Sequence, residues 1–132
     1  MRLIVVWQPM IQSDIARPGA KVLARVSDRR AAQFWDPQHH VARALRARLD
    51  ADPEHPRPRC CDDDGIPWDL VAIYPPGAKW DDALPRAAYI DGPVWRIKAA
   101  FRGKLKETLD ASPPARVGGI EETSTQSTRS LR

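Results

Sequence analysis

Short apolar runs and longer amphipathic stretches alternate along this chain. Leu3–Trp7 (LIVVW) is a continuous, β-branched apolar run that ends at Gln8 and Pro9, which is typical of a strand buried on both faces, as in a parallel sheet. The stretch 16–28 (ARPGAKVLARVSD) has apolar residues on one side and a proline suited to a first turn, and therefore predicts a helix. The segment 30–36 (RAAQFWD) predicts a second short strand.

A second helix is predicted from Gln38 to Leu49. Asp36-Pro37 favours a helix start, because aspartate accepts backbone N–H bonds and proline fits the first helical position. Apolar residues then recur every fourth position, with arginines mostly on the opposite face. The polar, proline-rich segment from Asp50 to Gly65 predicts a long loop.

Two further strands and a helix are predicted in the C-terminal half. Asp69–Tyr74 (DLVAIY) and 86–91 (RAAYID) are close in sequence, which favours an antiparallel pair. A helix is predicted from Val94 to about Leu109, because apolar residues follow one stripe. That stripe consists of Val94, Ile97, Phe101, Leu105 and Thr108. We expect one domain over residues 1–110 and a disordered tail over 111–132, where Pro, Gly, Ser and Thr are frequent.

The predicted order β-α-β-α-β-β-α indicates the α/β class, with a mixed sheet flanked by helices. A length of 132 residues favours a single domain. The net charge of +4 is mild and is explained by solubility. No apolar run approaches the roughly 20 residues that cross a bilayer, and no small-residue cleavage site follows the apolar start, so we expect a soluble chain without a membrane span or signal peptide. The compartment is not determined by the sequence.

The segments FWDPQHHVARAL and GIPWDLVAIYPPGAKW, with the antiparallel pair and helix after them, resemble the thioredoxin-like superfamily in its thiol-disulfide oxidoreductase (redoxin) branch. The resemblance spans roughly Leu3 to Leu109 and implies a partial thioredoxin-like fold. In that family a Cys-x-x-Cys motif at a helix N-terminus carries the reaction, because the helix dipole lowers the pKa of the first thiol. This chain has no such motif. The resemblance therefore implies a domain that begins after the catalytic segment and has no autonomous dithiol activity. Full-length relatives are frequently exported.

The same resemblance predicts an incomplete sheet. In the thioredoxin arrangement the strand before the motif lies between the counterparts of Leu3–Trp7 and Asp69–Tyr74. Without it, two unpaired strand edges face a gap, and such edges favour pairing with another chain. Hence we expect a shortened gene product or a half-domain completed by a partner, and the alternative function is a noncatalytic interaction module completed by a partner strand.

Cys60 and Cys61 are the two cysteines of the chain and the candidate catalytic residues. Adjacent Cα atoms lie about 3.8 Å apart, below the roughly 4.4–6.8 Å of ordinary disulfides, so a vicinal disulfide is strained and readily reduced. As a redox pair, one cysteine would attack a protein disulfide and the other would resolve the mixed disulfide. Reduced loop thiols and a soft-metal contact, such as Cu(I), are the alternatives.

A zinc site is disfavoured, because structural zinc prefers spaced Cys or His pairs. The local candidate ligands beside the cysteines are His55, Asp62, Asp63 and Asp64. The aspartates fit better as a solvated turn before Gly65, so we expect no metal and no cofactor. His39 and His40 fit best as solvated residues in the first turn of a helix.

Pro67, Trp68 and Asp69 are the candidate substrate-binding residues. Thioredoxin-like proteins place a cis-proline that lines the active site just before the corresponding strand, and Pro67 holds that place here. An ordinary proline at a strand start is the alternative. Trp68 and Asp69 follow it and are candidates for a substrate groove, although a buried tryptophan is the commoner use.

A basic stripe on the last predicted helix is the competing functional signal. It consists of Lys98, Arg102 and Lys106, with Arg96 and Lys104 beside it. Such a face can bind nucleic-acid phosphates, but the sequence has no recognised DNA-binding motif, and the wet side of an amphipathic helix explains the stripe. We therefore expect a protein thiol or disulfide substrate, or a strand-donating partner, rather than nucleic acid.

Overall fold

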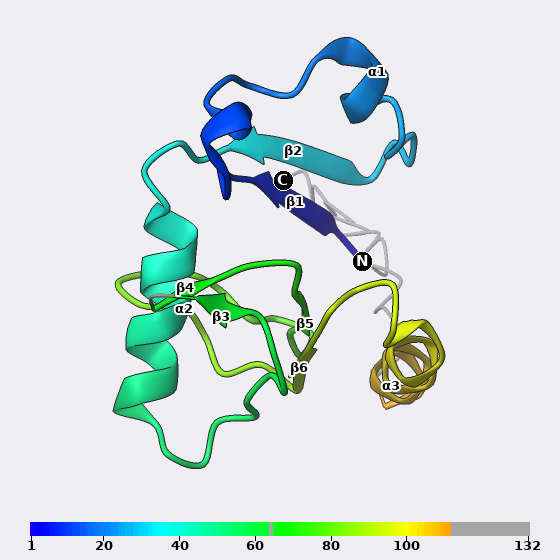
Figure 1. Ribbon diagram of the computed structural model, residues 1–132. Helices are drawn as coiled ribbons and strands as arrows, with labels where there is room; N and C mark the ends of the chain where they lie inside the picture. The colour runs from blue at the N-terminus through cyan, green and yellow to red at the C-terminus, as the bar shows by residue number, and fades with distance from the viewer. Residues whose placement is uncertain (64, 112–132) are drawn as a thin grey trace, which may run out of the picture.

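The computed structural model describes residues 1–63 and 65–111 and has the α/β class that the sequence predicts (Figure 1). The chain forms a parallel strand pair first, then a long helix, a small hairpin, an antiparallel pair and a final helix. In Figure 1 the first strand pair lies at the top, and the remaining elements lie below it, with helices α2 and α3 on opposite sides of the lower strands.

Strands β1 (Leu3–Trp7) and β2 (Ala31–Trp35) pair in parallel, with Leu3 opposite Ala31 and Trp7 opposite Trp35. β1 has the predicted bounds, and β2 is one residue shorter at each end than the predicted segment 30–36. A 3₁₀ turn, η1 (Gln12–Asp14), and a short helix, α1 (Ala20–Leu23), connect them.

Helix α1 is shorter than the predicted helix over 16–28, and the β2 side chain of Gln33 explains where it ends. Gln33 Nε2 donates to the carbonyl oxygens of Leu23 (3.0 Å) and Val26 (3.2 Å). These carbonyls thus have a hydrogen-bond partner although the helix does not continue.

Helix α2 (His40–Ala51) begins two residues later than predicted. His39 precedes it with a φ of 57°, in the left-handed region. Asp36 is 7% exposed, and its Oδ2 accepts a 2.8 Å hydrogen bond from the Val41 N–H. Asp36 therefore holds the start of the helix, as its sequence position indicated.

The loop predicted over residues 50–65 contains a small hairpin at its end. β3 (Asp62–Asp63) and β4 (Ile66–Pro67) pair antiparallel, and Gly65 in the turn has a φ of 76°. The sequence signal for this turn, an Asp-Gly dipeptide at positions 64 and 65, is a strong hairpin signal, and our interpretation of the segment as a plain loop was wrong.

β5 (Val71–Ile73) and β6 (Tyr89–Asp91) form the predicted antiparallel pair, and both are shorter than the sequence pattern indicated. α3 (Lys98–Asp110) follows and contacts β5. It begins four residues after Val94, because residues 93–97 form a tighter turn in which the Arg96 and Ile97 N–H groups donate to the Pro93 oxygen. Ala111 closes the helix, and residues 112–132 of the expected tail lie outside the described residues.

The expectation of one mixed sheet was wrong for the described residues, because their strands form three separate two-stranded sheets. In the part of the chain that the structure describes, β1 pairs only with β2, and β5 pairs only with β6. Within the described residues, β1 and β5 therefore each have one unpaired edge.

One face of the β1–β2 pair is also uncovered. Ile4 is 63% exposed and Phe34 is 54% exposed, although parallel sheets are normally covered on both faces. The buried apolar residues lie mainly around α2, β5 and β6: Ala42, Leu49, Ile73, Leu84, Ala87, Ile90 and Ile97. None of the described helices is long and apolar enough to cross a membrane.

Candidate functional site

Cys60 and Cys61 form a vicinal disulfide immediately before β3. Both residues are half-buried, and their Cα atoms lie 3.7 Å apart. Cys61 has a φ of 69°, in the left-handed region that non-glycine residues rarely adopt. The disulfide therefore lies in a locally constrained backbone that remains in part accessible to solvent.

Asp91, at the end of β6, holds the residue before the disulfide. Its Oδ2 accepts hydrogen bonds from Arg59 Nε (2.9 Å) and Nη2 (2.6 Å), and its Oδ1 accepts from the Arg59 N–H (3.1 Å) and the Gly92 N–H (2.9 Å). The Asp91 side chain is 7% exposed. Burial raises the pKa of Asp91, but the hydrogen bonds from Arg59 and Gly92 outweigh it and lower the pKa below its usual value. Asp91 is therefore an anion that fixes the loop at Arg59.

The hairpin holds the other side of the disulfide. The Trp68 N–H donates a 2.9 Å hydrogen bond to the Cys61 oxygen. Pro67 is buried in β4, and its oxygen accepts a 2.9 Å bond from Gln8 Nε2, which connects the hairpin to the end of β1. Pro67 and Trp68, two of the candidate substrate-binding residues, thus lie beside Cys61 at the β3–β4 hairpin.

Gly92 brings the end of β6 close to the disulfide. A Cβ atom at Gly92 would lie 2.6 Å from the Asp69 oxygen, 2.7 Å from Leu70 Cδ2 and 3.4 Å from Cys60 Sγ. Asp69 itself is exposed, with a φ of 47°. The cis peptide bond of the described residues precedes Pro93, not Pro67, so the comparison of Pro67 with the family cis-proline is wrong on geometry.

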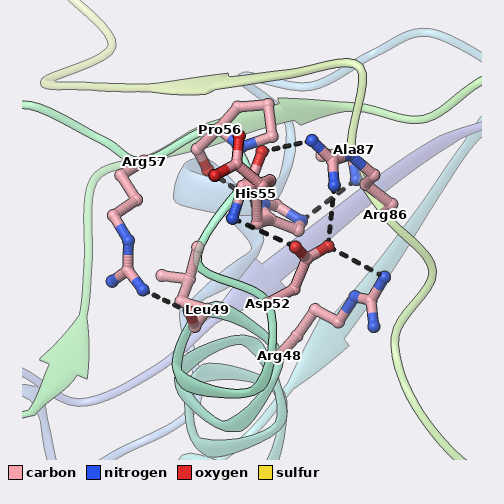
Figure 2. Close-up of polar contacts among 9 residues, drawn as sticks. Arg48, Leu49, Asp52, His55, Pro56, Arg57, Arg86 and Ala87 are labelled. Carbon is pink, nitrogen blue, oxygen red and sulfur yellow. Dashed lines mark hydrogen bonds and ion pairs between the residues drawn. The ribbon is translucent and has the colours of Figure 1, made fainter.

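His55 anchors the loop that leads to the disulfide (Figure 2). It is 3% exposed, and its Nε2 accepts a 3.1 Å hydrogen bond from the Ala87 N–H. Since Nε2 accepts, the ring proton is on Nδ1, which donates to the Pro56 oxygen at 2.6 Å. Nε2 therefore joins this loop to the segment before β6, while Nδ1 bonds within the loop itself.

Asp52 supports the same loop from the end of α2. Its Oδ2 accepts from Arg86 Nη1 (2.9 Å) and Arg48 Nη2 (3.4 Å), and its backbone oxygen accepts from the His55 N–H (2.9 Å). Figure 2 shows Arg48 and Arg86 converging on this carboxylate, while Arg57 reaches the Leu49 oxygen. The contacts of Asp52 with Arg48, Arg86 and His55 therefore stabilise the loop before the disulfide.

Metal binding finds no support in the described part of the chain. No group of three His, Cys, Asp or Glu side chains there lies in an arrangement that could hold a metal ion. His55 has both nitrogens occupied, and Asp62 is ion-paired with Arg46. The Asp64 residue and the Asp63 side chain lie outside the described residues.

Sequence reasoning missed the residues that hold the disulfide in place. Arg59 lies 32 positions before Asp91, its hydrogen-bond partner. No local sequence pattern joins Arg59 to Asp91 and Gly92. The signal present in the sequence is the Gly92-Pro93 dipeptide directly after Asp91. A glycine at a strand end also permits close backbone approach.

Comparison with known proteins adds no identity to this geometry. No protein-family model, curated protein or solved structure matches the chain. The site is therefore described by its own residues: two half-buried, disulfide-bonded cysteines between the Asp91–Arg59 contact and the β3–β4 hairpin.

Proposed function

We propose that the protein is a thioredoxin-like relative of the thiol-disulfide oxidoreductases in which Cys60 and Cys61 form the redox-active pair. The observation that supports this is the vicinal disulfide between two half-buried cysteines, held on both sides by hydrogen bonds. Its substrate would be a protein thiol or disulfide. The chain lacks a Cys-x-x-Cys motif, so we expect stoichiometric exchange rather than sustained turnover by the isolated chain.

The proposed exchange proceeds in two balanced steps. In the reduced chain, one cysteine thiolate attacks a sulfur of the substrate disulfide, which forms a mixed disulfide and expels one substrate thiolate. The second cysteine, as thiolate, then attacks the protein sulfur of the mixed disulfide. This forms the Cys60–Cys61 bond and releases the second substrate thiolate, so that the substrate gains two electrons and the protein loses two.

Trapping of the mixed disulfide tests this mechanism. The reduced chain and the variants Cys60→Ser and Cys61→Ser are treated with oxidised glutathione and analysed by intact mass. We expect a persistent single glutathione adduct on at least one single-cysteine variant and oxidised, adduct-free protein for the unaltered chain. Equal, persistent adducts on the unaltered chain would show that no resolving step occurs, and the Cys60→Ser/Cys61→Ser double variant controls for other reactions.

A second function is favoured by a separate observation. β1 and β5 each have one unpaired edge in the described structure, and Ile4 and Phe34 are exposed on the uncovered face of the parallel pair. We therefore propose, as the alternative, a noncatalytic interaction module in which an extended strand from a partner protein pairs with these edges.

The backbone of β1 offers a specific test of this second function. The Leu3 N–H donates to Arg30 and the Trp7 oxygen accepts from Asp36, so the odd-numbered residues face β2 and the Ile4 N–H faces the free edge. Ile4→Pro removes that free N–H and leaves the β2 pairing intact. It should abolish binding of a labelled apolar strand peptide, whereas Ile4→Val should retain it. Binding unaffected by Ile4→Pro would contradict pairing at this edge.

A further inference from the structure

An apolar groove lies between β5 and the first half of α3. Its lining residues are Val71, Val94, Ile97, Lys98, Phe101 and Arg102. The volume is about 260 Å³, below the roughly 300–1,000 Å³ of a typical small-molecule site. The groove is therefore better suited to a few apolar side chains than to a cofactor.

The groove adjoins β5, a strand that has an unpaired edge among the described residues. Val71 belongs both to the groove and to β5, and among the described residues β5 pairs with β6 along one edge and with no strand along the other. A strand that added to the other edge would present alternate side chains to the same face. Main-chain pairing with β5 and side-chain insertion into the groove are then compatible, which is the combination that extended peptides use at open sheet edges.

The groove rim carries positive charge that the described residues do not neutralise. Lys98 and Arg102 lie one helical turn apart, and neither has a carboxylate partner among the described residues. By contrast, Lys104 on the same helix pairs with Glu107 at 2.8 Å. A ligand with an acidic side chain beside its apolar residues would complement this rim.

We propose that this groove binds an extended apolar strand of a partner protein that carries a glutamate or aspartate beside its apolar residues. The inference rests on the second function proposed above, strand completion, and names the chemical class of the partner. The apolar residues of the strand occupy the groove, and its carboxylate lies against Lys98 and Arg102.

Three labelled heptapeptides with the same alternating Val-Thr core and different flanking residues test the proposal on the full chain by fluorescence anisotropy. The flanks are glutamate, glutamine or lysine. We expect the glutamate-flanked peptide to bind at least about tenfold more tightly than the lysine-flanked one at low salt. A glutamate-flanked peptide with proline at its centre should not bind, because it cannot pair as a strand.

Charge reversal identifies the groove as the binding site. Lys98→Glu/Arg102→Glu should invert the preference, so that the lysine-flanked peptide binds about tenfold more tightly than the glutamate-flanked one. The matched control is Lys21→Glu/Arg25→Glu, which reverses an exposed Lys-Arg pair of the same spacing near α1. This control should change the affinity by less than about twofold.

Each contrary result has a distinct meaning. Equal binding of all three flanks would overturn the acidic partner class and leave strand completion intact, whereas binding of none would overturn both. Equal effects of the two charge reversals would overturn the groove as the site. Self-association of the chain that excludes the peptide would assign the groove to a second copy. Binding to phosphatidylserine vesicles without peptide binding would assign the groove to a membrane surface. Self-association and vesicle binding would each overturn the proposal.

Discussion

Single residues that contact distant backbone, rather than the cysteines themselves, decide where the disulfide lies. Asp91 fixes Arg59, Gly92 allows the end of β6 to approach Asp69, and His55 fixes the loop through Ala87. The cysteines are evident in the sequence because of their rarity. Their supports are not, because a hydrogen bond across about thirty residues depends on the fold rather than on a local pattern.

Gly92→Ala should destabilise the protein by about 1–3 kcal/mol, because the new methyl group would overlap the Asp69 oxygen. The matched control is Gly103→Ala in α3, where a Cβ atom would meet no described atom outside the helix backbone within 4 Å and alanine favours the helix by about 1 kcal/mol. Urea unfolding of both variants measures the difference. A Gly92→Ala midpoint equal to that of the unaltered chain would contradict the close approach.

His55→Leu should destabilise the protein by about 1–3 kcal/mol, because the buried Ala87 N–H loses its acceptor. His40→Leu is the control at an exposed histidine, and its effect should be smaller, about 0.5 kcal/mol. Thermal unfolding by circular dichroism compares the two variants. Equal losses of stability would show that the contact with Ala87 contributes little.

At the scale of elements, hydrophobic periodicity predicted more of the helices and strands than turn-forming residues did. β1, β2 and the antiparallel β5–β6 pair follow the apolar runs, and α2 follows its fourfold spacing. The length of α1 could not be predicted in this way, because a glutamine on β2 satisfies the carbonyls at its end. The β3–β4 hairpin was missed although the Asp-Gly signal was present in the sequence.

The start of α2 should make stability depend on acid pH. Burial raises the pKa of Asp36, but the N–H groups of Val41, His40 and Gln38 and the nearby charge of His40 outweigh it and lower the pKa below 3.8. A carboxylate with a lowered folded-state pKa contributes stability above about pH 4, and this contribution is lost as the pH falls through the folded-state pKa.

Asp36→Ala should therefore reduce stability at pH 7 by about 0.5–2 kcal/mol and weaken the further loss on acidification below pH 4. Asp14→Ala is the control, since Asp14 is exposed in η1. Urea unfolding at a series of pH values gives both quantities. A parallel pH profile for Asp36→Ala and the unaltered chain would contradict the role of this carboxylate.

At the scale of the whole molecule, the strands of the described residues form three separate pairs rather than one sheet. The α/β class and the order of the main elements follow from the sequence, but the single mixed sheet that it predicts is absent from the described residues. In Figure 1 β1 lies on the side of β2 that faces the lower strands. Gln8, just after β1, donates a hydrogen bond to the oxygen of Pro67, in the hairpin next to the disulfide. The strand edge of β1 and the Cys60–Cys61 pair therefore belong to neighbouring parts of the molecule.

The most direct test of the account is a redox titration of Cys60 and Cys61. The full chain is equilibrated in glutathione buffers of graded composition, its free thiols are alkylated, and mass spectrometry counts and locates them. We predict one reversible two-electron transition, in which two molecules of glutathione reduce the Cys60–Cys61 disulfide and form one molecule of oxidised glutathione. Two free thiols at every ratio, or a disulfide that no ratio reduces, would contradict the proposed redox function.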